Sequence, residues 1–325
     1  MLIHFGTFDK YLLIDFVHAL RHPIFDLLYF CMQPYFVEKD HDELLQMAFE
    51  QAIYIANIGV CLFTVLLNGA VLLHLAFKRK GRKSQHLSMI TIKILLENLF
   101  ALSAIVYSSS ALLLLQGIGI SRHWIFLSSS FQQSLIAALG MLNIFIALDR
   151  LFALRAVVNY SAYLAQKNES AAIFLVFCTS VSCLGIYLLY RRDSPGSNFI
   201  QLVDSSVLVA VQLSSIGLFT VGLIITGVFL IYLNQFTLQC KVEVVTVFTN
   251  IVRKVNKIVI YSMAVEFVIM VVFGLFMEHI CIIHTFDVLG PITSIYTTLC
   301  AFVHYAILVR KRKTSLVSSF QKTMS

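Results

Sequence analysis

The sequence predicts an all-α membrane protein built as a bundle of seven transmembrane helices, and three observations support this fold class. Hydrophobic residues make up 59% of the 325 residues and charged residues only 13%, and the mean hydropathy is +0.85. Soluble domains carry about 25% charged and 45–50% apolar residues, so this composition excludes a water-soluble fold. The apolar residues form long runs, without the alternating segments of about ten residues that a membrane β-barrel requires.

Seven runs are long enough to cross a membrane, because the hydrocarbon core of about 30 Å needs roughly 20 apolar residues in a helix. They span residues 52–77, 87–115, 124–148, 171–190, 205–233, 258–283 and 286–309. Backbone groups in lipid must be paired within the segment, so each run is predicted to be a helix. We therefore expect an extracellular amphipathic segment over 1–50, a transmembrane domain over 51–309 and a cytoplasmic basic tail over 310–325.

Residues 11–36 within the N-terminal segment are rich in Leu, Ile and Phe, but polar residues and a proline interrupt them. The interrupting residues are Asp15, His18, Arg21, His22, Pro23 and Asp26. No 18-residue apolar window remains, and we expect this segment to lie on the membrane surface. The alternative is an eighth span.

Basic residues fix the predicted orientation, since lysine and arginine accumulate in cytoplasmic loops. Seventeen of the 24 lie in the connections after the first, third and fifth spans and in the tail, against six on the other side. The N-terminus is thus predicted outside and the C-terminus in the cytosol. The net charge of +7 follows from this topology, and no nucleic-acid partner is expected.

Polar and helix-breaking residues recur at set places in the spans. They are Asn68-Gly69, Glu97, Asp149-Arg150, Pro291 and Tyr296. Their order and spacing resemble the rhodopsin-like G-protein-coupled receptors, in which an Asp/Glu-Arg-Tyr motif ends the third helix and an Asn-Pro-x-x-Tyr motif lies in the seventh.

The chain also departs from the rhodopsin-like pattern. No cysteine occurs near Trp124 or within residues 191–204, so the usual disulfide from the third helix is missing. The fourth span has no Trp, the fifth and sixth have no Pro, and Gly290 stands where the asparagine of the seventh-helix motif would be. The pattern is most similar to the divergent nematode-type serpentine chemoreceptors.

This resemblance implies a G-protein-coupled chemosensory receptor in the plasma membrane, which binds a small molecule from outside and activates a heterotrimeric G protein. It implies a coupling or switching role for Asp149, Arg150, Glu97, Pro291 and Tyr296. The expected partners are the ligand, the G protein and the lipid bilayer, with no cofactor or metal. A membrane transporter or ligand-gated channel is the alternative, although no internal repeat is found. No catalytic motif predicts an enzyme.

Insertion of an ionisable residue into the middle of a span costs about 2.5–3.5 kcal/mol of free energy, so each such residue is expected to have a structural or functional role. Lys93 and Glu97 are four residues apart on one helical face, and an ion pair between them is one explanation. The other makes Glu97 part of a polar switch between helices. Glu266, near the middle of the sixth span, either faces a polar residue of a neighbouring helix or lines the ligand cavity.

The third span carries two further candidate ligand-binding residues, Gln132 and Gln133, which join Glu266 in that role. Among the rhodopsin-like receptors that the chain resembles, those for biogenic amines carry an aspartate about eighteen residues before the motif arginine. A neutral glutamine at that distance before Arg150 argues against an amine ligand. Asn143, two turns before Arg150, is expected to hydrogen-bond to another helix.

Overall fold

The computed structural model describes residues 42–78, 88–155, 162–192, 199–239, 248–273 and 289–309. The chain divides into two units, residues 1–51 and 52–325, and the description below concerns the second. The predicted surface segment over 11–36 and the basic tail over 310–325 lie outside the described residues.

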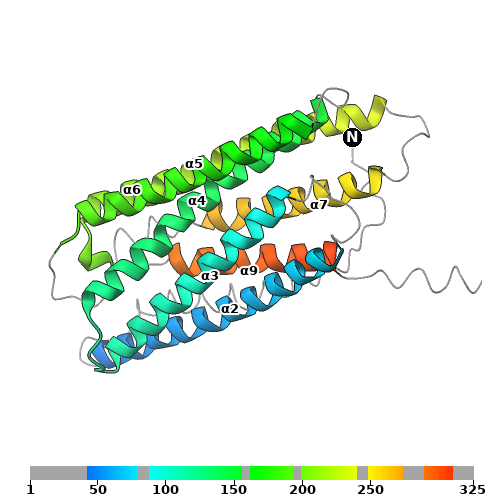
Figure 1. Ribbon diagram of the computed structural model, residues 1–325. Helices are drawn as coiled ribbons and strands as arrows, with labels where there is room; N and C mark the ends of the chain where they lie inside the picture. The colour runs from blue at the N-terminus through cyan, green and yellow to red at the C-terminus, as the bar shows by residue number, and fades with distance from the viewer. Residues whose placement is uncertain are drawn as a thin grey trace, which may run out of the picture. The chain divides into compact units, whose positions relative to one another are not determined.

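The described residues are helical almost throughout (Figure 1). The elements are α2 Asp42–Lys78, α3 Ser88–Leu115, α4 Arg122–Arg155, α5 Ala162–Leu189, η3 Phe199–Leu202, α6 Ser205–Gln239, α7 Phe248–Glu266, η4 Phe267–Phe273 and α9 Leu289–Leu308. η3 is a 3₁₀ turn, and η4 is a π-helix that continues α7 directly.

Six of the described helices are long and apolar enough to cross a membrane: Glu50–Phe77, Ser88–Leu115, Arg122–Ala153, Gln166–Leu189, Ser205–Leu233 and Gly290–Leu308. They confirm six of the predicted spans. The remaining span, predicted over 258–283, is described as an apolar helix over Ile258–Val272, and residues 274–283 lie outside the described part. The predicted all-α membrane bundle is confirmed.

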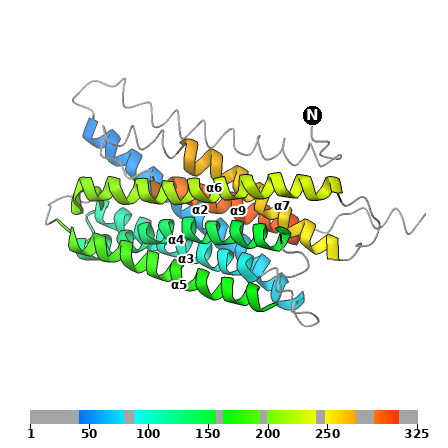
Figure 2. The same cartoon turned by 90° about the horizontal axis from the view of Figure 1, so that it is seen from above.

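α4 is the central helix of the bundle. It packs against α3, α5 and α6, and Figures 1 and 2 both show it alongside them. Of its most apolar stretch, 67% is buried inside the protein, against 17% for α5. The outer face of α5 presents large apolar side chains such as Phe174, Phe177 and Leu189, which suits contact with lipid.

The contact between α4 and α6 depends on a glycine. A Cβ atom at Gly140 would lie 3.0 Å from the Cβ atom of Leu218 on α6, closer than side-chain carbon atoms normally approach. A glycine at this position lets the two backbones come together, as small residues commonly do between membrane helices.

The end of the bundle at Trp124, predicted to be extracellular, is closed by an apolar cluster. Phe199 of η3 is fully buried, with its ring centroid 5.4 Å from that of Tyr187 and 6.1 Å from that of Phe126. Val203, just after η3, forms a single antiparallel bridge with Arg191. We call the set Phe126, Tyr187, Phe199 and Val203 the end cluster.

Polar contacts surround the end cluster. The Arg191 guanidinium hydrogen-bonds to His123 and lies over the ring of Phe126, and Arg192 forms an ion pair with Asp204. Asp204 also caps α6, since its carboxylate accepts hydrogen bonds from the backbone N–H and the hydroxyl of Ser206. These hydrogen bonds, chiefly the one from the Ser206 hydroxyl, lower the pKa of Asp204 below its usual 3.8.

Candidate functional site

Five helices direct polar side chains into the interior of the bundle. The side chains, each at most 7% exposed, belong to Asn68, Lys93, Glu97, Asn143, Glu266, Tyr296 and His304. We call them the polar network. Buried polar groups in a lipid-embedded bundle must find partners within the protein, so their contacts show which helices are held together.

Asn143 connects three helices through one amide group. Its Nδ2 atom donates to Glu266 Oε2 on α7 at 2.9 Å and to the Tyr296 hydroxyl on α9 at 3.0 Å. The ring of Tyr296 packs edge-on against Phe219 of α6, with centroids 5.7 Å apart. The predicted interhelical role of Asn143 is confirmed. Of the two alternatives for Glu266, this hydrogen bond shows the contact with a polar residue of a neighbouring helix.

Glu97 makes its contacts with α2 and α9. Its Oε2 atom accepts a hydrogen bond from Asn68 Nδ2 at 3.4 Å and lies 3.6 Å from His304 Nδ1. The ion pair expected between Lys93 and Glu97 does not form among the described residues. Lys93 Nζ instead lies 5.6 Å from the centroid of the Tyr296 ring. The helical spacing placed both residues on one face, but the partners offered by α2 and α9 determine their contacts.

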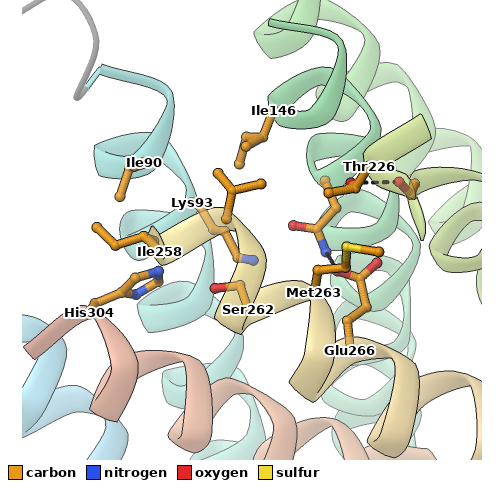
Figure 3. A pocket seen from close by; sticks show the side chains of 12 residues that line it. Ile90, Lys93, Ile146, Thr226, Ile258, Ser262, Met263, Glu266 and His304 are labelled. Carbon is orange, nitrogen blue, oxygen red and sulfur yellow. Dashed lines mark hydrogen bonds between the residues drawn. The ribbon is translucent and has the colours of Figure 1, made fainter. Parts of the chain in front are cut away.

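A cavity of about 20 Å³ opens inside the network. Its lining includes Lys93, Asn143, Ser262, Glu266 and His304 (Figure 3). A water molecule needs about 10–15 Å³ by this measure, whereas sites for organic ligands occupy roughly 300–1,000 Å³. Glu266 therefore lines a cavity that fits one water molecule. No group of three metal-ligating side chains occurs among the residues that the structure describes.

The two candidate glutamines lie elsewhere on α4. Gln132 and Gln133 are 1% and 2% exposed, and Gln132 Nε2 is 3.2 Å from where a Cβ atom at Gly290 would stand. Eleven residues, about 16 Å of helix, separate Gln132 from Asn143. The structure thus divides the predicted ligand-binding residues, with Gln132 facing the start of α9 and Glu266 inside the polar network.

Ser129 belongs with these glutamines, and sequence reasoning missed it. It lies three residues before Gln132 and four before Gln133, a spacing that puts all three on one face of α4. Ser129 Oγ and Gln132 Oε1 are buried without a hydrogen-bond partner among the described residues. We call Ser129, Gln132 and Gln133 the glutamine face. Its i, i+3, i+4 pattern was the signal that could have found it.

Asp149 and Arg150 form a buried ion pair near the other end of α4. They are 4% and 5% exposed, and the Arg150 guanidinium contacts the Asp149 carboxylate. α4 continues beyond the pair to Arg155. The pair lies seven residues, or two helical turns of about 10 Å in all, beyond Asn143.

α9 supplies the remaining predicted residues. Tyr296 belongs to the polar network, whereas Pro291 is the third residue of the helix. The switching role that the resemblance implies for Pro291 stays a prediction. Sequence reasoning missed His304, although Tyr296, Cys300 and His304 recur at intervals of four and are all fully buried.

Residues 47–191 match the family model of the serpentine type 7TM GPCR chemoreceptor Srbc. The match runs from α2 to the residues just after α5 and covers fewer than half of the residues of the chain. It confirms the resemblance to nematode-type serpentine chemoreceptors that the motifs indicated. None of the curated proteins matches the chain.

Proposed function

We propose that this multi-pass membrane protein, similar to the serpentine chemoreceptors, binds a small molecule from outside the cell and activates a heterotrimeric G protein. The observation that carries the proposal is the line of buried polar groups along α4, from the glutamine face through Asn143 to Asp149 and Arg150. A plasma membrane location follows from this activity, since the ligand and the G protein lie on opposite sides.

The glutamine face is the proposed place for the polar part of the ligand. Its unpartnered Ser129 hydroxyl and Gln132 carbonyl offer hydrogen bonds without a charge. Unpaired buried polar atoms cost free energy, which a ligand with matching donors and acceptors would recover. The ligand class that this chemistry suits is a small, neutral molecule with at least one hydrogen-bonding group.

α9 links this face to the polar network. Gly290, which Gln132 approaches closely, and Tyr296, which binds Asn143, are six residues apart on the same helix. A ligand that displaces the start of α9 therefore acts on the hydrogen bond between Tyr296 and Asn143. Since Asn143 also holds Glu266 of α7, the displacement reaches α7 as well.

Arg150 is the proposed point of contact with the G protein. Its guanidinium offers five N–H donors in a rigid fork, and part of this fork binds Asp149 in the structure. When α7 moves away from α4, the fork becomes accessible to backbone carbonyl groups of an inserted G-protein segment. In the resting state, by contrast, the ion pair with Asp149 occupies the Arg150 guanidinium and so limits basal activity.

Substitutions of Arg150 test this proposal through ligand-stimulated nucleotide exchange on a co-expressed G protein. Arg150→Ala is expected to abolish exchange while surface display stays near normal. Arg150→Lys should restore exchange only in part, because an ammonium group cannot make the forked contacts. Asp149→Asn should raise basal exchange, since it weakens the resting pair.

Arg155→Ala is the matched control, because it removes an arginine from the last position of the same helix. It should leave exchange close to the wild-type level. Normal exchange by the Arg150→Ala protein would reduce Arg150 to a membrane anchor and disprove the coupling mechanism. Ligand-evoked ionic current in the absence of any G protein would favour the channel alternative.

A further inference from the structure

The cavity inside the polar network lies between a buried cation and a buried carboxylate. Lys93 approaches it from α3 and Glu266 from α7, and both are 4% exposed. Among the described residues, no carboxylate lies at ion-pair distance from the Lys93 ammonium, which sits over the ring of Tyr296. An ammonium and a carboxylate so deep in a membrane protein are costly unless something connects them.

The α7 side of the cavity offers two polar atoms, Glu266 Oε1 and Ser262 Oγ. Glu266 Oε2 accepts the hydrogen bond from Asn143, but Glu266 Oε1 has no partner among the residues that the structure describes. Ser262 Oγ meets the thiol of Cys300, a weak hydrogen-bonding group that leaves the hydroxyl able to accept a stronger bond. Ser262 and Glu266 are four residues apart, so they share one face of α7. Figure 3 shows the Ser262 side chain and that of Lys93 pointing toward one another.

We propose that this cavity binds one water molecule, which joins the Lys93 ammonium to the Glu266 carboxylate. The water oxygen accepts a hydrogen bond from Lys93 Nζ, and its two hydrogens are donated to Glu266 Oε1 and Ser262 Oγ. Three hydrogen bonds are the usual number for a buried water, and a bridging water is nearly as favourable in enthalpy as a direct contact. The result is a water-mediated ion pair between α3 and α7.

The lining of the cavity selects water over other small ligands. The Lys93 ammonium repels a metal cation, and the free oxygen of Glu266 repels an anion. A volume of about 20 Å³ excludes any organic molecule of more than a few atoms. A neutral molecule that both accepts and donates hydrogen bonds fits all three conditions.

The bridge holds α7 to α3, as Asn143 holds α7 to α4. Movement of α7 away from the bundle would remove the Glu266 counter-charge from the ammonium and leave Glu97 of its own helix, so the bridge favours the arrangement in which Arg150 is buried. This regulatory consequence rests on the proposed function. The bridge itself does not, and its test uses the stability of the purified protein without a ligand or G protein.

A double-mutant cycle on purified full-length protein tests the bridge. Lys93→Met and Glu266→Gln should each lower the melting temperature. The double variant should lose less than the sum of the single losses, with a coupling of about tenfold in the unfolding equilibrium. Ser262→Ala should weaken this coupling, because it removes one partner of the water. Additive losses would overturn the proposal.

Ser215→Ala is the matched control for Ser262→Ala. Ser215 is also buried (2% exposed, against 5% for Ser262), but its hydroxyl donates to the carbonyl of Val211 in its own helix at 2.9 Å, so the coupling should not change. A coupling that Ser262→Ala leaves intact would indicate direct contact and no water. If the single variants do not fold, a high-resolution density map of the wild-type protein decides the matter. One peak within hydrogen-bond distance of Lys93 Nζ and Glu266 Oε1 supports the bridge, and its absence disproves it.

Discussion

The middle of the bundle and its end at Trp124 differ in their contacts: a network of polar groups runs through the apolar packing of the middle, whereas the end is built around aromatic rings. In the middle, the polar network joins α2, α3, α4, α7 and α9 through amide, carboxylate and hydroxyl groups. At the end, aromatic rings of the end cluster pack around Phe199, with ion pairs and hydrogen bonds at their edge.

The solvent around each region explains why polar contacts mark the middle and aromatic contacts mark the end. Inside the bilayer, apolar side chains gain little by leaving lipid for protein, so apolar burial does not by itself bring helices together, and hydrogen bonds give the contacts their specificity. The end of the bundle at Trp124 is predicted to lie in water, where burial of an aromatic ring stabilises the fold by the ordinary hydrophobic effect. The kind of residue that stabilises each region is therefore set by its solvent.

Phe199→Ala is the largest perturbation that this comparison predicts. The substitution empties a fully buried aromatic site between Phe126 and Tyr187, and such a change costs about 3–5 kcal/mol in a water-exposed fold. We expect a clear loss of thermal stability in detergent or nanodiscs, measured by the melting temperature of the purified protein.

Trp124→Ala provides the control at the same end. Its side chain is larger than that of Phe199 but 53% exposed, so its removal should lower the melting temperature much less. Equal losses from the two substitutions would show that the end of the bundle does not depend on a packed cluster. That result would contradict the proposed difference between the end and the middle.

Asn143→Ala is expected to have the next largest effect, in the middle of the bundle. It removes the amide that serves both Glu266 and Tyr296 and leaves a buried carboxylate oxygen without this donor. A hydrogen bond to a charged group contributes about 1.5–3 kcal/mol, although contacts between membrane helices average about 0.6 kcal/mol in measured cycles. The melting temperature of the purified variant measures the loss.

Asn98→Ala on α3 separates this effect from the removal of any asparagine. The Asn98 amide oxygen has no hydrogen-bond partner among the described residues, so the substitution should be close to neutral. A loss as large as that of Asn143→Ala would mean that the particular contacts of Asn143 do not determine stability in the middle of the bundle.

The same contrast governs how much of the molecule the sequence predicts. Spans depend on the length of an apolar run, which a single chain displays directly, and six of the seven are confirmed by described helices. The polar network depends on which helices are neighbours. Helical spacing suggested a pair between Lys93 and Glu97, but Glu97 turns to Asn68 on the preceding helix α2 and to His304 on α9, which is distant in the sequence.

Periodicity within one helix also indicates which of its faces is buried. Tyr296, Cys300 and His304 mark the buried face of α9, and Ser129 with Gln132 and Gln133 marks that of α4. Such a pattern shows which residues share a face but not the helix that they meet. The end cluster escaped prediction altogether, because the contacts of Phe199 depend on the folded ends of α4 and α5.

Acidification should affect the end of the bundle through Asp204, and this is the smallest effect that we predict. Hydrogen bonds from the hydroxyl and backbone N–H of Ser206, with the nearby Arg192, lower the pKa of Asp204 below its usual 3.8. The carboxylate therefore stabilises the folded state above that value, and this contribution disappears as the pH falls through the lowered pKa. Solvent around the cap screens the ion pair and keeps the effect small. The difference in melting temperature between the wild-type and Asp204→Asn proteins should therefore be largest near pH 6 and shrink as the pH falls below 3.8 toward the lowered pKa. A difference that does not shrink on acidification would show that the charge of Asp204 is not what stabilises the start of α6.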